Sequence, residues 1–137
     1  MKKEKPSVDR WLEEARSDPS APLCGMYLVH SGVVRETARA KVRQGETGTA
    51  PVRGMDFSFD RDKVAAALEE ARAMPGIHYL RLWLNEGRLE LGDDIMLVLV
   101  GGDIRPHVID ALQALVGRVK NECVVERELF PGEEKGV

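Results

Sequence analysis

The sequence is poor in cysteine and in aromatic residues, and it contains no long apolar run. Its 137 residues include two cysteines, and aromatic residues make up 5%. Cys24 and Cys123 lack the paired spacing of a zinc site, so we expect free thiols in a reducing compartment. The longest apolar run falls far short of the roughly 20 residues that a membrane helix needs. The charged start, MKKEKPSVDRW, lacks the apolar stretch of a secretory signal. We therefore predict a cytoplasmic protein without a membrane partner.

No charge of one sign dominates the composition. Lysine and arginine number 20, aspartate and glutamate 23, and the formal net charge is −3. A dedicated nucleic-acid-binding protein is usually strongly basic, so this class is excluded. Apolar residues at 43% and charged residues at 31% are typical of an ordinary globular protein. The length favours a single domain over residues 1–137, with 131–137 as a loose tail.

Several familiar catalytic motifs are also missing. The chain has no P-loop, no glycine fingerprint for dinucleotides, no His-Glu-x-x-His and no nucleophile-elbow serine. His30, His78 and His107 are scattered, and such residues are more often packing or surface residues than ligands. The adjacent pair Asp93-Asp94 is typical of a turn, because neighbouring turn residues rarely converge on one substrate.

The pattern of apolar residues predicts an α+β domain. Ser7 can cap a short helix that ends before Asp18-Pro19. Residues 23–34 follow as a strand or strand pair, 55–59 as a strand, and then comes a helix capped by Asp60 or Asp62. The strand over 77–84 precedes a turn. Strands outnumber helices, so we predict a mixed, mostly antiparallel sheet with two to three packed helices.

The last third of the chain, residues 87–130, carries the clearest pattern. A short strand and a turn precede Ile95–Val100, an apolar run rich in branched residues that predicts a strand buried on both faces. Pro106 then suits the first turn of a helix. Apolar residues at helical spacing lead to Lys120, with Arg127 on the strand beyond. The helix dipole alone can explain a lysine there. The functional alternative is a lysine that binds an anion or acts as nucleophile or base.

The stretch from Arg35 to Gly54 breaks the apolar pattern. It contains four arginines, one lysine and two acidic residues. We predict a long, mobile, basic loop, and loops of this length are usually functional or disordered. A solvated charged loop without a function is the alternative.

Two ordered sets of residues resemble the large, catalytic subunit of molybdopterin synthase. The first is Gly87-Arg88-Leu89-Glu90-Leu91-Gly92-Asp93-Asp94, followed by the apolar strand and by a helix that ends in Arg118-Val119-Lys120. The second is Gly32-Val33-Val34-Arg35, which is similar to the family's Gly-x-Val-Arg before a long loop. The resemblance covers nearly the whole chain. It depends on the order of the motifs along the sequence rather than on any single motif.

The resemblance implies an α/β hammerhead-like fold and a specific reaction. In that family the large subunit forms a homodimer within a heterotetramer. Each copy accepts the Gly-Gly tail of a small ubiquitin-like sulfur carrier (MoaD-like) that bears a thiocarboxylate. Sulfur passes to a cyclic pyranopterin monophosphate, which gives molybdopterin. The chemistry implies a lysine at the reacting centre, cations that hold phosphate and carboxylate, and neither a metal nor another cofactor.

The family's site residues carry over in part. Lys120 matches the lysine at the helix end, and Arg127 matches the second catalytic lysine. Arg105 matches the arginine of a His-Arg pair whose histidine is replaced by Ile104, and Arg35 matches the arginine before the loop. Catalytic roles for Lys120 and Arg127, and substrate binding by Arg35 and Arg105, are thus expected.

The basic loop adds further cations to this expected site. Arg39, with Lys41 and Arg43, is expected to close over the anionic substrate or to contact the small subunit. Cys123 lies between the two basic catalytic positions and could be a thiol participant, although a small buried residue is the simpler interpretation.

The departures from the family pattern leave a second function open. Arginine binds phosphate well but stays protonated, so Arg127 cannot replace a lysine that must exchange a proton. Leu84-Asn85 stands where the family has an upstream His-Arg. The alternative is a non-catalytic paralogue that binds a ubiquitin-like partner or a phosphate or pterin ligand. A structural dimer through the C-terminal strand is the third hypothesis.

Overall fold

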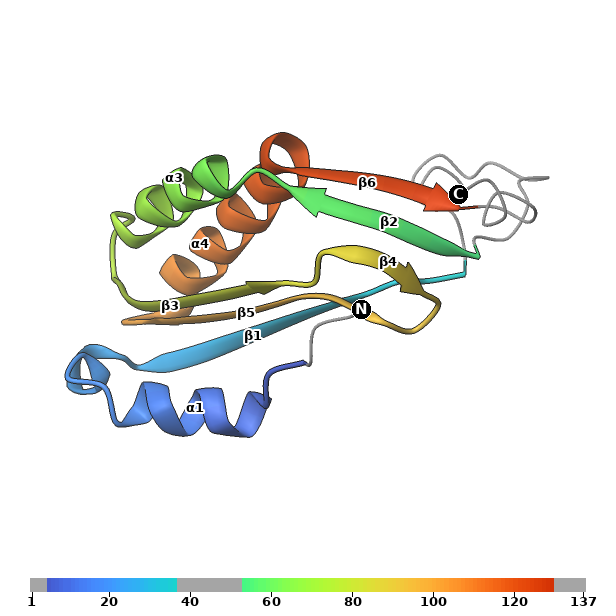
Figure 1. Cartoon of the computed structure of the whole chain (residues 1–137). Coiled ribbons are helices and arrows are strands. Elements are labelled where there is room, and N and C mark those ends of the chain that lie inside the picture. Colours follow the sequence, from blue (N-terminus) through green and yellow to red (C-terminus); the bar gives the residue numbers. More distant parts are fainter. Residues whose placement is uncertain (1–4, 37–52, 130–137) are drawn as a thin grey trace.

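The computed structural model describes residues 5–36 and 53–129 of the chain. Two antiparallel three-stranded sheets and three α-helices make up this part (Figure 1). In chain order the elements are α1 (Val8–Arg16), the 3-10 turn η1 (Ala21–Leu23), β1 (Met26–Val33), β2 (Gly54–Phe59), α3 (Arg61–Arg72), β3 (Ile77–Leu84), β4 (Gly87–Glu90), β5 (Asp94–Gly102), α4 (Arg105–Arg118), the π-helical turn η2 (Val119–Cys123) and β6 (Val124–Leu129).

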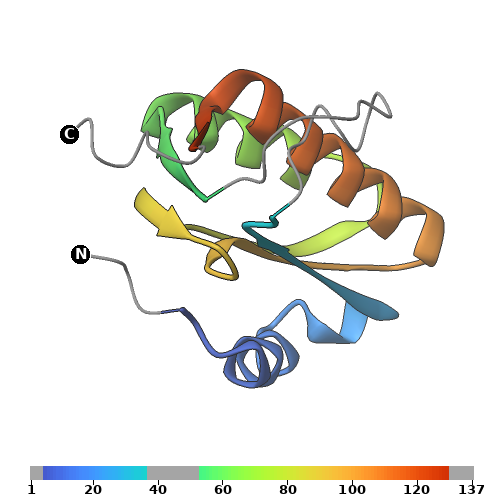
Figure 2. The ribbon, with the colours of Figure 1, turned by 90° about the vertical axis from the view of Figure 1, so that its right-hand side faces the viewer.

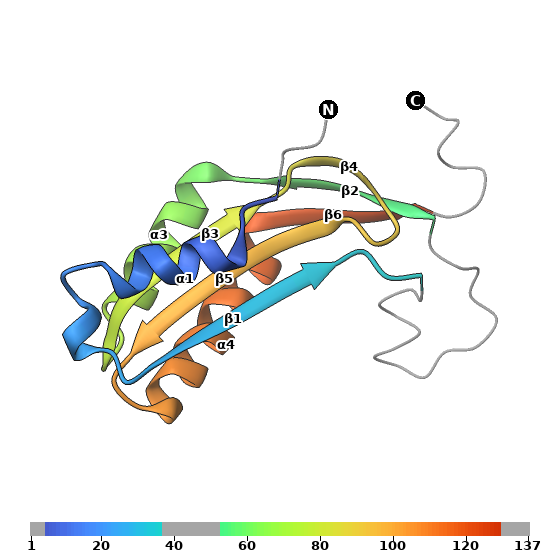
Figure 3. The ribbon, with the colours of Figure 1, turned by 90° about the horizontal axis from the view of Figure 1, so that it is seen from below.

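The strands form two separate sheets where the pattern predicted one. Sheet A has the order β1-β5-β3, and sheet B has the order β4-β2-β6. Figure 2 shows α3 and α4 on one side of sheet A and α1 on the other. Figure 3, seen from below, shows α1 lying across the outer face of sheet A. The predicted α+β class is confirmed, and all strand pairs described are antiparallel.

Strand β5 is the centre of the molecule, and both of its faces are buried. Met96, Val98 and Val100 face the core cluster under α3, α4 and sheet B. Leu97 and Leu99 face a second cluster under α1, which includes Trp11. Each such side chain contributes about 1.5–3 kcal/mol when it is fully buried. The prediction of a strand buried on both faces is confirmed.

Side-chain caps and a proline mark the residues at which the three helices begin. Ser7 caps α1, and its hydroxyl accepts a hydrogen bond from the Arg10 backbone N–H at 3.2 Å. Asp60, one of two predicted caps, accepts from the backbone N–H groups of Asp62 and Lys63. Pro106 lies in the first turn of α4, as predicted. None of the helices described is long and apolar enough to cross a membrane.

The turn between β4 and β5 depends on glycine and aspartate. Gly92 has a φ of +83°, a conformation that glycine adopts at little cost. The Asp93 carboxylate accepts a hydrogen bond from the Glu90 backbone N–H at 2.7 Å. The predicted turn role of Asp93 is therefore confirmed. Backbone hydrogen bonds between Val34 and residues 92 and 93 place the end of β1 beside this turn.

Candidate functional site

Lys120 lies in the π-helical turn η2, where α4 gives way to β6. Val119 and Cys123 are buried and anchor this turn in the core, while Lys120 is half-buried. The π-helix is rare, and single π-helical turns, mostly found inside α-helices, are frequent at functional sites. Among the described residues Lys120 has no ion-pair partner, whereas Arg118 pairs with Glu70 and Glu122. Lys120 therefore presents a cationic amine from a rigid position.

His30 is the neighbour of Lys120 that the sequence did not reveal. It lies on β1, on the same face as Met26 and Leu28, which pack against the main core cluster. Burial lowers the pKa of His30, and the positive charge of Lys120 lowers it further. Both effects favour the neutral form of the imidazole. No sequence motif links His30 to Lys120, because the two residues lie far apart in the sequence. Only the packing of α4 brings Lys120 close to His30.

Cys123 does not have the environment of a reactive thiol. It is 4% exposed, and burial raises the pKa of its thiol. A thiolate is the reactive form of cysteine, so a raised pKa makes the side chain inert at neutral pH. The interpretation of Cys123 as a small buried residue agrees with this geometry, and a role as thiol participant does not.

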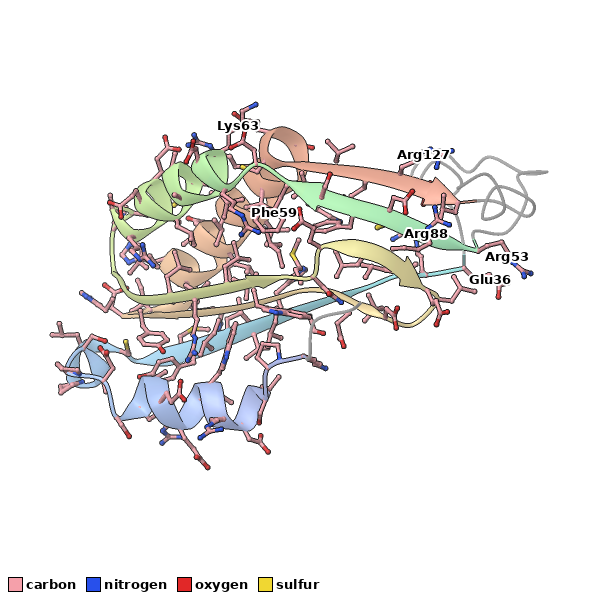
Figure 4. All side chains as sticks on the ribbon, viewed as in Figure 1. Glu36, Arg53, Phe59, Lys63, Arg88 and Arg127 are labelled. Atoms are coloured by element: carbon pink, nitrogen blue, oxygen red, sulfur yellow. The ribbon has the colours of Figure 1, made fainter. Side chains whose placement is uncertain are left out.

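Arg127 lies on the outer face of sheet B, in a row with Asp56 and Arg88. Met55 and Phe57 are buried, so the alternation along β2 turns Asp56 away from the core. Arg88 Nε donates to Asp56 Oδ1 at 3.0 Å, and Arg127 Nη1 lies 3.5 Å from Asp56 Oδ2. The hydrogen bond from Arg88, assisted by Arg127, lowers the pKa of Asp56. Figure 4 shows both arginines at the same end of the molecule as Glu36 and Arg53.

Arg105 lies at the opposite end of α4 from Lys120. It is exposed in the first helical turn, beside Asp103, whose carboxylate is 2.7 Å from the Nδ1 atom of His107. Fifteen residues of helix separate Arg105 from Lys120, which corresponds to roughly 20 Å. Arg105 and Lys120 of one chain therefore do not share a pocket.

The remaining predicted cations belong to the basic loop. Arg35 is exposed directly after the end of β1. Arg39, together with Lys41 and Arg43, lies outside the described residues. The same holds for most of the predicted loop and for the whole of the predicted tail. Glu36 and Arg53 are the described residues on either side of that segment, and Arg35 directly precedes Glu36.

The cavity that the structure defines between α3 and α4 lies apart from these cations. Its volume is about 410 Å³, and its walls include Ala67, Ala71, Met74 and the ion pair of Glu70 with Arg118. None of the predicted site residues lines it. The cavity is mostly apolar, so it does not suit a phosphate or carboxylate.

Three of the predicted cations, Lys120, Arg127 and Arg105, therefore lie in separate places in the described part of the chain. Lys120 lies on η2, where its charge acts on His30 of β1. Arg127 and Arg88 lie on the outer face of sheet B, and Arg105 lies at the start of α4. The first of these places combines a cation with a neutral base, which suits a bound anion next to a proton transfer. Sequence patterns did not reveal Arg88 and Asp56, because their pairing depends on the strand register.

Solved molybdopterin synthase proteins share this fold. The chain is similar to the molybdopterin synthase from Staphylococcus aureus, with 18% identity, a TM-score of 0.71, and coverage of 94% of this chain and 88% of that chain. It is also similar to the molybdopterin biosynthesis MoaE protein from Burkholderia ambifaria MC40-6, with 18% identity, a TM-score of 0.64 and coverage of 93% and 84%. At these identities the likeness establishes the fold.

A third solved structure is a complex of two different chains. It is the protein–protein complex of subunits 1 and 2 of the molybdopterin-converting factor from Helicobacter pylori 26695. Identity is 14%, the TM-score is 0.62, and coverage is 93% of this chain and 86% of that chain. This similarity also concerns the fold.

The sequence itself establishes the family. The family model described as MoaE protein matches residues 1–122, and the chain belongs to the MoaE family. Membership places the chain in molybdenum cofactor biosynthesis. The predicted resemblance to the large subunit of molybdopterin synthase is confirmed. No curated protein matches the sequence.

Proposed function

We propose that this chain is the large, catalytic subunit of a cytoplasmic molybdopterin synthase. It accepts the thiocarboxylated tail of a small ubiquitin-like subunit and transfers the sulfur to a cyclic pyranopterin monophosphate. Family membership supports this proposal, and so does the similarity to a two-subunit molybdopterin-converting factor. The product is the dithiolene of molybdopterin.

The position of Lys120 is the observation that carries the proposal. Its amine is half-buried on a π-helical turn, next to a neutral imidazole and without an acidic partner among the described residues. An amine without an ion pair is available to an anionic substrate or to a reacting carbonyl. Lys120 is therefore assigned as the reactive amine.

The arginines are assigned to binding rather than to proton transfer. Guanidinium groups hold phosphate and carboxylate in bidentate geometry but do not give up a proton at neutral pH. Arg127 lies on the outer face of sheet B, apart from Lys120, and Arg35 follows the end of β1. Both are assigned to binding the anionic groups of the substrate or of the small subunit's tail, with Arg39 from the adjoining segment. Arg105 acts from a second copy in a homodimer, because roughly 20 Å of helix separates it from Lys120 of its own chain.

A non-catalytic paralogue is the second candidate, and one observation favours it. Arg127 replaces a lysine and contacts Asp56 on the outer face of sheet B. If turnover needs an amine there, the chain binds the small subunit or a phosphate ligand without reacting.

Reconstitution with a thiocarboxylated small subunit and the pterin precursor tests the proposal. We expect product with the wild-type chain and a loss of roughly 100-fold or more in rate for Lys120→Ala, because a general base or nucleophile is removed. Lys63→Ala, which removes an exposed lysine of α3 (Figure 4), is the matched control and retains the rate.

Two results would contradict the assignment. Product formation unchanged in Lys120→Ala would remove Lys120 from the reaction. Calorimetric binding of the small subunit by the wild-type chain without any product would favour the non-catalytic paralogue.

A further inference from the structure

One flank of α4 and η2 carries a stripe of five residues that runs the whole length of the helix. Arg105, Ile109, Leu112, Val116 and Lys120 follow one another every three or four residues, so they share one side of the helix. The middle three are apolar and only half-buried. The stripe is therefore apolar in its middle and cationic at both ends.

The stripe lies on the flank of α4 that is turned away from α3. Ala114 and Arg118 line the cavity between these two helices. Leu112 and Val116 each precede one of them by two residues, which is about half a turn around the helix. Figure 3 shows α4 with α3 on one side and β1 along the other. The third described helix, α1, lies on the outer face of sheet A, so none of the described helices covers the stripe.

Strand β1 extends the apolar surface beside the stripe. Met26 and Leu28 of β1, like Leu112 and Val116 of α4, pack against the main core but are only partly buried. In the described part of the chain β1 is an edge strand, because sheet A pairs it with β5 on one side alone. A contiguous apolar surface of this kind is typical of a contact site for protein.

The stripe is symmetric about its own centre, which lies between residues 112 and 113. Arg105 and Lys120 are equally far from this point along the sequence, and so are Ile109 and Val116. A two-fold axis there would place the α4 helices of two copies side by side and antiparallel, with Ile109 of one copy against Val116 of the other. An isologous contact needs such a self-complementary patch, whereas a different partner protein does not.

We propose that this flank of α4 is the interface with a second copy of the chain, and that antiparallel packing about Leu112 brings Arg105 of each copy next to Lys120 of the other. Packed helices lie about 8–10 Å apart, a gap that two long side chains can span. The inference rests on the proposed function for the role of Arg105 in the site. The interface itself follows from the stripe.

The apolar middle and the charged ends of the stripe have different tasks. The apolar side chains supply the affinity, because they leave water when the two copies meet. Arg105 and Lys120 carry charges of the same sign, which oppose association. The two cations therefore serve the site, and the apolar residues between them hold the copies together.

Cross-linking between copies tests the antiparallel geometry. The background is Cys24→Ser, because Cys24 is the native thiol that is not buried. Chains with Arg105→Cys and chains with Lys120→Cys are refolded together and treated with a short bismaleimide. We expect cross-linked dimers from the mixture. Each variant refolded alone should give few, since like positions then lie roughly 20 Å apart along the helices.

A second pair of variants tests the position of the two-fold axis. Gln113→Cys lies beside the proposed axis on an exposed residue, so this chain should cross-link to itself. Glu69→Cys, on the exposed side of α3, is the matched control and should stay uncross-linked.

Sedimentation equilibrium measures the contribution of the apolar middle. Ile109→Lys places a charge in the interface from both copies, so the dissociation constant of the dimer should rise roughly 100-fold or more. Ile109 lies outside the two core clusters of the described residues, so the variant should keep its fold, which its backbone amide spectrum checks. Val125→Lys, at a residue that is 66% exposed on sheet B, is the matched control and should keep the wild-type constant.

Three outcomes would overturn the inference. They are a monomeric wild-type chain, a dimer whose dissociation constant is unchanged in Ile109→Lys, and cross-linking of Glu69→Cys that is as efficient as that of Gln113→Cys. A monomeric chain that loses the small subunit in Ile109→Lys would assign the flank to the small subunit instead. The cross-linking and sedimentation experiments need no turnover, so a failure of sulfur transfer would appear separately, in the reconstitution assay.

Discussion

At the scale of single residues, Asp56 joins three strands through its side chain. It pairs with Arg88 on β4 and with Arg127 on β6 across the outer face of sheet B. The three side chains are 37%, 39% and 59% exposed for Arg88, Asp56 and Arg127, so solvent weakens both ion pairs. The triad therefore orients the two guanidinium groups more than it stabilises the fold.

Asp56→Asn should show this small contribution through its pH dependence. The pKa of Asp56 lies below the ordinary value of 3.8, so its carboxylate stabilises the folded chain above that pH and loses the effect as the pH falls through the folded pKa. We expect the variant to lower the free energy of unfolding by about 0.5–1 kcal/mol at neutral pH and by nearly nothing at about pH 2.

Urea denaturation at the two pH values measures this difference. Asp110→Asn, on the exposed side of α4, is the control for the loss of a negative charge. A deficit of the same size at both pH values would show that the side-chain ion pairs are not its cause.

At the scale of elements, the end of β5 and the start of α4 lie so close together that Gly102 has no room for a side chain. A Cβ atom on Gly102 would lie 2.6 Å from the backbone oxygen of Gly76 and 2.8 Å from Cγ2 of Val108. The backbone N–H of Gly25 donates to the oxygen of Gly102 at 2.7 Å, so the strand cannot easily move away. The glycine is thus required by packing.

A matched pair of glycine substitutions tests this close approach. Gly102→Ala should destabilise the chain by about 1–3 kcal/mol, because an overpacked backbone has to shift. Gly117→Ala, inside α4 with no atom within 4 Å of the added Cβ, should stabilise it by roughly 0.5–1 kcal/mol. Thermal unfolding of both variants gives the comparison, and equal effects would contradict the role of packing.

At the scale of the whole molecule, two of the proposed site residues lie at opposite ends of α4. Lys120 and Arg105 of one chain lie roughly 20 Å apart along the helix. In a homodimer a complete site can therefore combine Lys120 of one copy with Arg105 of the other. Two inactive variants then complement each other, because one of the two sites in a mixed dimer is intact.

Mixing Lys120→Ala with Arg105→Ala tests this arrangement. After refolding together in equal amounts, the mixture should recover about a quarter of the wild-type rate, since half of the dimers are mixed and each has one intact site. Each variant refolded alone is the control and should stay nearly inactive. A mixture that stays inactive would contradict a site shared between copies.

The sequence alone predicted most of the fold, because the signals involved are local. Ser7 and Asp60 cap helices through their own neighbours, and Pro106 fits the first turn of α4. The apolar run 95–100 is long enough to require burial on both faces, and β5 is buried on both faces. The ordered motifs also identified the family that the comparison confirmed.

Only the tertiary structure decided which charged residues meet. The choice of pairing partners divides the strands between two sheets. The register within sheet B brings Arg88 and Arg127 together at Asp56. The packing of α4 on β1 brings Lys120 to His30, a residue about ninety positions away in the sequence. The sequence determined the elements and the family through near neighbours, whereas the site depends on contacts between distant segments.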